Sequence, residues 1–84
     1  MRAIDLVAYN LRRIRTKNLI SQESLAIESG VARTHVSRIE RGLENPTIGI
    51  LEKFAAVIEC KIGEFFEEPN GNEVAPLKSG RKKK

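Results

Sequence analysis

Cysteine is almost missing from this sequence of 84 residues, because it occurs only once, at Cys60. A single thiol cannot form a disulfide within the chain, which favours a reducing compartment such as the cytoplasm. No apolar run approaches the ~20 residues that a membrane-spanning helix needs. The first residues, MRAIDLVAYNLRR, lack the uninterrupted apolar core of a secretory signal. We therefore expect a small cytoplasmic protein that does not associate with membranes.

Residues of the kinds that carry out catalysis are scarce as well. The only histidine, His35, and the only cysteine have no partners at the spacing typical of metal ligands. The chain also lacks a phosphate-binding P-loop and a nucleophile elbow. We therefore expect no enzymatic activity, no metal and no cofactor. Cys60 is interpreted as a small core residue, and His35 as a solvated or capping residue rather than a reader of bases.

Positive charge is unevenly distributed along the chain. Residues 1–68 hold ten basic and ten acidic side chains, so the net charge of +4 comes entirely from 69–84. A neutral body whose basic residues crowd into 12–41 suits a protein that places one face against phosphate. Residues 69–84 combine Pro, Gly and Lys with little apolar content, which predicts a domain over 1–68 and a disordered basic tail over 69–84. Nonspecific attraction to phosphate and plain solvation are both open roles for that tail.

Apolar residues recur at helical intervals. Val7, Leu11 and Ile14 predict a helix over about 5–17, with Asp5 as its N-cap and a turn at Asn18. A second apolar stripe predicts a helix over 48–58 with Phe54 at the border of the stripe. Its inward positions are Ile48, Leu51, Ala55 and Ile58. Residues 63–67 are expected to form one further short helix.

The stretch 22–42, QESLAIESGVARTHVSRIERG, predicts two short helices joined at Gly30, with Val36 and Ile39 facing inward on the second. The opposite face of the second helix is polar, and nothing in the sequence obviously covers it. Its side chains are Arg33, Thr34, Ser37, Arg38 and Arg41. Arginine can read guanine edges, threonine can meet a thymine methyl, and serine can bond a base or a phosphate. We expect this face to lie in the major groove of double-stranded DNA.

Several motifs resemble the helix-turn-helix of phage-repressor/Cro-like (XRE family) regulators. They are SQE at 21–23, LA at 25–26, GV at 30–31, VSRIERG at 36–42, NPT at 45–47 and FF at 65–66. The resemblance covers roughly residues 7–66. It implies an all-α, compact five-helix bundle of the lambda-repressor-like DNA-binding type, whose second and third helices form the motif. It also implies a sequence-specific transcriptional regulator, and short controllers of restriction-modification systems are one variant of the family.

The same resemblance implies roles for four further residues. Gln22 would contact phosphate and brace the recognition helix, the alternative being a surface glutamine that starts a helix. Glu40 would pair with Arg15 of the first helix, the alternative being a solvated acid. Asn45 and the backbone of its loop would touch phosphate, although Glu44 works against that contact.

Three positions depart from the pattern that the family usually shows. Leu19 and Glu59 stand where relatives tend to have glycine, which bears on the turns after two helices. Ala32 stands where many relatives have a serine or threonine that caps the recognition helix. Loss of such a cap costs on the order of 1 kcal/mol.

A chain this short buries a small core and is only marginally stable alone, which favours dimerisation. We expect a homodimer on a near-palindromic operator, and the apolar excess near the C-terminal end of the domain indicates the candidate interface. Its residues are Ile50, Val57, Phe65 and Phe66. The alternative function is an antitoxin-type interaction module that binds a partner protein and also represses its own operon.

Overall fold

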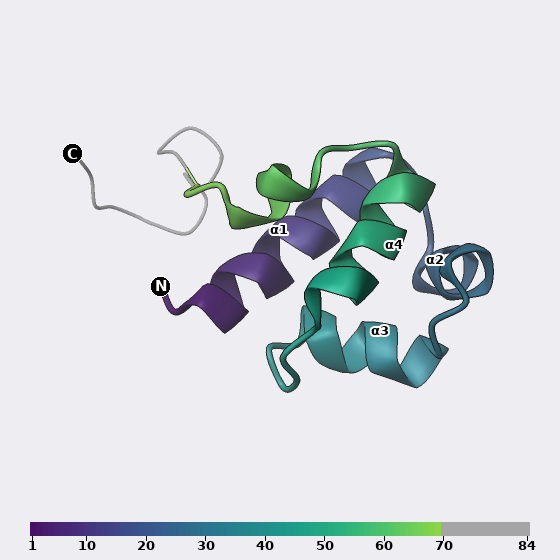
Figure 1. The fold of residues 1–84 in the computed structure, drawn as a ribbon, viewed down its shortest axis with the longest axis horizontal. Helices are drawn as coiled ribbons and strands as arrows, with labels where there is room; N and C mark the ends of the chain where they lie inside the picture. The colour runs from purple at the N-terminus through teal and green to yellow at the C-terminus, as the bar shows by residue number, and fades with distance from the viewer. Residues whose placement is uncertain (70–84) are drawn as a thin grey trace.

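Four α-helices and one 3-10 helix form residues 1–69, which are the residues that the computed structural model describes (Figure 1). They are α1 Ala3–Lys17, α2 Gln22–Ser29, α3 Arg33–Glu40, α4 Ile48–Ile58 and the 3-10 helix η1 Ile62–Phe66. The predicted all-α class is confirmed, but the predicted fifth helix is a 3-10 helix. Five residues are too few to nucleate an α-helix readily, whereas they suffice for 3-10 hydrogen bonds such as Glu64 N–H to Lys61 O at 2.9 Å. Residues 70–84, most of the predicted tail, lie outside the described residues.

All five elements contribute side chains to one core. α1 packs against α3 and η1, α2 packs against α3 and α4, and α4 also contacts η1, with α3 along one edge of the molecule (Figure 1). Each element contributes at least one apolar side chain that is fully buried; these include Leu11, Leu25, Val36, Phe54 and Phe65. No helix within residues 1–69 is long and apolar enough to cross a membrane.

The inner stripe of α4 differs from the predicted one at two positions. Phe54, predicted at the border, is fully buried, whereas Ile48, predicted inward, has 60% of its surface exposed. Leu51, Phe54, Ala55 and Ile58 repeat at the three- and four-residue intervals of one helix face. Ile48 occupies the first position of α4, beyond the end of the core. Thr47 caps this helix, since its hydroxyl accepts a hydrogen bond from Ile50 N–H at 3.1 Å.

The predicted N-cap of α1 is wrong. The helix begins at Ala3 with Arg2 as its N-cap, and Asp5 lies inside the first turn. Arg2 Nε donates a hydrogen bond to Asp5 Oδ2 at 2.9 Å, and this bond lowers the pKa of Asp5 below its ordinary value. Asp5 therefore stabilises the helix from the first turn, where a carboxylate opposes the positive end of the helix dipole.

A buried polar side chain of α1 holds η1 in place. Asn10 is fully buried, and its Nδ2 donates to Phe65 O at 2.9 Å and Glu67 O at 2.8 Å. Its Oδ1 accepts from Arg13 Nη2 at 3.3 Å. Because both amide donors bind carbonyls of the C-terminal segment, Asn10 holds Phe65 in the core. The sequence signal for this role was the position of Asn10 on the apolar stripe, between Val7 and Ile14.

Two non-glycine residues have left-handed backbone conformations. Leu19 follows α1 with φ 61°, and Glu59 follows α4 with φ 67°. The predicted turn residue Asn18 instead has φ −93°. Both left-handed positions are those at which relatives of the resembled family tend to have glycine, because an L side chain there crowds its own backbone.

We expect Leu19→Gly to raise the free energy of unfolding by about 0.5–1 kcal/mol. The left-handed conformation costs a non-glycine residue about 1–2 kcal/mol, and glycine avoids that cost. Part of the gain in stability is lost, because glycine also increases the conformational entropy of the unfolded chain. Leu19 is 94% exposed, so the substitution removes no packing. Urea unfolding measures the change. Ala56→Gly, at an exposed position inside α4, is the matched control and should lose about 0.5–1 kcal/mol.

Candidate nucleic-acid interface

The turn between α2 and α3 is set by local signals. Ser21 Oγ accepts a hydrogen bond from Ser24 N–H at 2.9 Å and so caps α2. Gly30 ends α2 with φ 77°, and its N–H donates to Ala26 O at 2.9 Å. Ala32 stands at the N-cap of α3 and makes no side-chain cap, as its side chain predicts. Two short helices with a sharp turn between them are the result.

The outer face of α3 is an open, cation-rich surface, which we call the α3 face. A shallow concavity of about 340 Å³ lies over it, and the residues that line it are Arg33, Thr34, Ser37, Arg38 and Arg41. These are the same five residues of α3 and its end that the sequence placed on the outward side. α3 lies along one edge of the molecule (Figure 1), and all of these side chains are exposed except Ser37, which is half-buried. Three arginines and two hydroxyls supply many hydrogen-bond donors there.

A buried ion pair lies behind the α3 face. Arg15 donates from Nε to Glu40 Oε2 at 2.5 Å and from Nη2 to Glu40 Oε1 at 2.9 Å. Arg15 Nη1 donates to Ile20 O at 2.8 Å, and Gln22 Nε2 donates to Glu40 Oε1 at 3.0 Å. Only 2% of the Glu40 side-chain surface is exposed. The pair joins α1 to the end of α3, and Gln22 adds the start of α2 to it.

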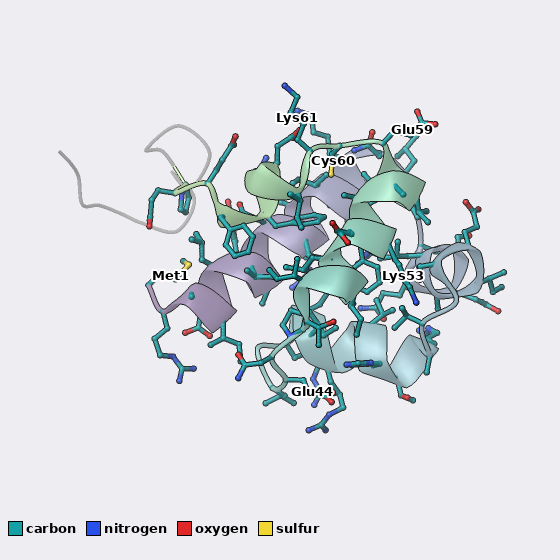
Figure 2. All side chains as sticks on the ribbon, viewed as in Figure 1. Met1, Glu44, Lys53, Glu59, Cys60 and Lys61 are labelled. Atoms are coloured by element: carbon teal, nitrogen blue, oxygen red, sulfur yellow. The ribbon has the colours of Figure 1, made fainter. Side chains whose placement is uncertain are left out.

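A second carboxylate, Glu44, lies beside the α3 face. Its Oε1 accepts a hydrogen bond from Arg38 Nε at 3.0 Å, and its Oε2 lies 3.6 Å from His35 Nε2. Figure 2 shows Glu44 at the same edge of the molecule as α3, on the side opposite to Lys61. Sequence reasoning missed this pairing of Glu44, because the contact depends on the turn at Gly42, where φ is 71°. A Cβ at Gly42 would lie 3.0 Å from Asp5 Oδ1, so glycine suits this turn for two reasons.

The predicted dimer residues fall into two groups. Phe65 is fully buried in the subunit core, so its prediction as an interface residue is wrong. Asn10 draws its backbone inward, which the doublet of phenylalanines does not reveal. Phe66 is 43% exposed, whereas Ile50 and Val57 are half-buried against the core.

The remaining candidate residues from the sequence are Asn45 and Cys60. Asn45 is exposed in the loop between α3 and α4. Cys60 is half-buried, and desolvation, with a smaller contribution from the Glu64 carboxylate, raises the pKa of its thiol. Within residues 1–69, no group of three or more His, Cys, Asp or Glu side chains is placed to hold a metal ion.

The α2–α3 pair, with its sharp turn and an exposed cationic second helix, defines a helix-turn-helix domain. Comparison with known families agrees, since the family described as helix-turn-helix matches residues 11–65. The chain belongs to the phage-repressor/Cro-like, XRE-type helix-turn-helix family.

Relatives and solved structures of this family resemble the chain over most of its length. The HTH-type transcriptional regulator SlrR of Bacillus subtilis (strain 168) is 38% identical over 58 residues, which are 68% of this chain and 38% of SlrR. SinR of the same strain is 32% identical over 69 residues, 81% of this chain and 62% of SinR. The chain thus spans less than two thirds of either regulator. The crystal structure of the restriction-modification controller protein C.AhdI from Aeromonas hydrophila has a TM-score of 0.73 and 33% identity, over 75% of this chain and 96% of C.AhdI.

Proposed function

We propose that this protein is a sequence-specific regulator of transcription that binds double-stranded DNA through the α3 face. The observation that carries the proposal is the open concavity lined by Arg33, Thr34, Ser37, Arg38 and Arg41. Arginine is the commonest reader of guanine in the major groove, and short hydroxyl side chains bind bases or phosphates there. Family membership supports the same docking, because the second helix of this motif enters the major groove.

Residues of the α3 face divide between base reading and positioning. Arg33 and Arg38 lie in the first two turns of α3, so we assign them to bases, with Thr34 and Ser37 beside them. Arg41 follows the last helical residue and is assigned to phosphate, together with Asn45 of the next loop. Gln22 is assigned to bracing, since its amide is hydrogen-bonded to Glu40 at 3.0 Å.

The buried ion pair removes an electrostatic obstacle to this binding. A bare carboxylate at the end of α3 would repel DNA phosphates, but Glu40 is nearly covered and hydrogen-bonded to the Arg15 guanidinium. Its charge is compensated within the subunit. Glu40 therefore does not offset the positive charge of the arginines on the α3 face.

A homodimer on a near-palindromic operator is the second part of the proposal. α3 has eight residues and is about 12 Å long, so one subunit reaches only a few base pairs. Two subunits related by a two-fold axis would place their α3 helices in major-groove sites about 10 base pairs apart. Partly exposed apolar side chains on α4 and η1 support an interface there; they are Ile50, Val57 and Phe66.

One more specific candidate, control of a restriction-modification system, has an observation in its favour. The chain matches 96% of the controller C.AhdI at a TM-score of 0.73, whereas it matches only part of SlrR and SinR. The antitoxin alternative gains no support from these relatives. Coexpression with a restriction endonuclease gene placed behind the selected operator would test the controller role.

Arg38→Ala should weaken binding to the selected operator by about 10–100-fold while random-duplex affinity falls much less. The reason is that one good bidentate base contact is worth about 1–3 kcal/mol of discrimination, whereas phosphate attraction is shared by many groups. The operator is first selected from random duplexes, and both affinities are then titrated at one salt concentration.

Lys61→Ala is the matched control, because it removes one exposed cation from the side opposite to α3 (Figure 2). This variant should keep the operator preference of the unmodified protein. Equal losses of operator and random binding in Arg38→Ala would remove Arg38 from the base readers. Failure of the unmodified protein to prefer any duplex would refute the proposed function itself.

A further inference from the structure

The Arg38–Glu44 ion pair is unusual for a DNA-reading surface, because it places a carboxylate beside a base-reading cation. Arg38 Nε donates to Glu44 Oε1 at 3.0 Å, and both side chains are about half exposed. Exposed ion pairs contribute little to folding stability. Stability therefore does not account for an acid at a position where it opposes the approach of phosphate.

The geometry leaves the end of the guanidinium available. A guanidinium carries five N–H donors, one on Nε and four on the two terminal nitrogens. Glu44 occupies Nε, and the structure gives Arg38 no other side-chain hydrogen bond within residues 1–69. The two terminal nitrogens remain as a fork, and such a fork matches the O6 and N7 acceptors of guanine.

Glu44 also lies near a second side chain of α3. Its other oxygen, Oε2, lies 3.6 Å from His35 Nε2, one turn before Arg38 on α3. The carboxylate thus spans two side chains of the same helix, and its backbone is placed by the turn at Gly42. The hydrogen bond to Glu44 favours those rotamers of Arg38 that keep Nε beside the carboxylate before DNA binds, which reduces the entropy lost on binding.

We propose that Glu44 is a specificity-determining residue that aims the Arg38 fork at a guanine and suppresses its attraction to phosphate. The inference rests on the proposed function of the α3 face. An unpaired Arg38 would bind any nearby phosphate and add to affinity for every sequence. Paired with Glu44, its net charge toward phosphate is cancelled, whereas its terminal donors still meet a base edge. Glu44 therefore lowers the affinity of the protein for random duplexes and increases the ratio of operator to random affinity.

Glu44→Gln tests this role, because glutamine keeps the size of the side chain and removes its charge. We expect tighter binding to random duplexes, and a plot of log affinity against log salt that steepens by about 0.9, the contribution of one added phosphate contact. The ratio of operator to random affinity should fall by about 10-fold, with the loss concentrated at one guanine. Fluorescence anisotropy on the operator, on single-base variants of it and on random duplex measures all three.

Two controls separate specificity from bulk charge. Glu52→Gln removes an exposed acid from α4, so it should leave the guanine preference unchanged. In the Arg38→Ala background, Glu44→Gln should no longer change the operator-to-random ratio, because its effect acts through Arg38. Thermal unfolding of each variant checks that the fold is retained.

The outcomes distinguish this inference from the function on which it rests. If the unmodified protein prefers an operator and Glu44→Gln keeps both that ratio and the salt slope, the role of Glu44 is refuted and the regulator stands. The role of Glu44 is also refuted if Glu44→Gln weakens discrimination equally against all single-base variants of the operator. If the unmodified protein prefers no duplex, both the inference and the regulator fail.

Discussion

Glu40→Ala is expected to lower the free energy of unfolding by about 3–5 kcal/mol, a large part of the stability of so small a domain. The substitution leaves the Arg15 guanidinium buried without the carboxylate that accepts two of its hydrogen bonds. Gln22 loses its partner as well. Desolvation of an unpaired charge is the dominant cost, so stability should fall before DNA recognition can be assessed. Urea unfolding followed by circular dichroism measures the loss.

Two further variants isolate the cause of that loss. Gln22→Ala removes a neutral donor and should cost about 1 kcal/mol. The double variant Arg15→Met, Glu40→Leu removes both charges, so it should recover much of the stability that Glu40→Ala loses. A Glu40→Ala protein with the thermal stability of the unmodified chain would contradict the structural importance of the pair. A double variant as unstable as Glu40→Ala would show that shape, not unpaired charge, is the cause.

Phe66→Asp is expected to convert the proposed dimer to monomers and to weaken operator binding by about 10²–10⁴-fold, the range by which two linked binding sites exceed one. Because both subunits of a two-fold symmetric dimer carry the substitution, two carboxylates would face the same apolar interface. Phe66 is 43% exposed, and its replacement leaves the core residue Phe65 untouched. Sedimentation equilibrium measures the oligomeric state, and a titration with full and half operators measures the affinity.

Ile27→Asp is the control for the added charge. Ile27 is an exposed apolar residue on α2, an element that packs against α3 and α4 rather than against η1. This variant should remain dimeric and lose little operator affinity. A Phe66→Asp protein that sediments as a dimer would exclude Phe66 from the interface. A monomeric variant with undiminished affinity would show that one subunit suffices for binding.

Sequence patterns predicted some residues of the candidate site and missed others. Arg33, Thr34 and Ser37 were placed on the outward face by the helical interval from Val36 and Ile39 alone, and the structure gathers them on one concavity. The Arg15–Glu40 contact joins residues 25 positions apart, so periodicity could not supply it and only the family resemblance suggested it. Glu44 was interpreted only as an acid that opposes phosphate, because nothing local indicates which way the loop after Gly42 turns.

Local interactions explain what the sequence determined by itself. The bounds of α4, the division of 22–42 into two helices and the turn at Gly30 depend on neighbours within one or two helical turns, so short-range patterns predict them. Long-range packing decided the rest. Phe65 entered the core because Asn10, 55 residues earlier, binds its carbonyl, and Ile48 stayed exposed because the core ends before it. Apolar character indicates that burial of a side chain is favourable. Which residues surround that side chain is determined only when elements distant in sequence pack together.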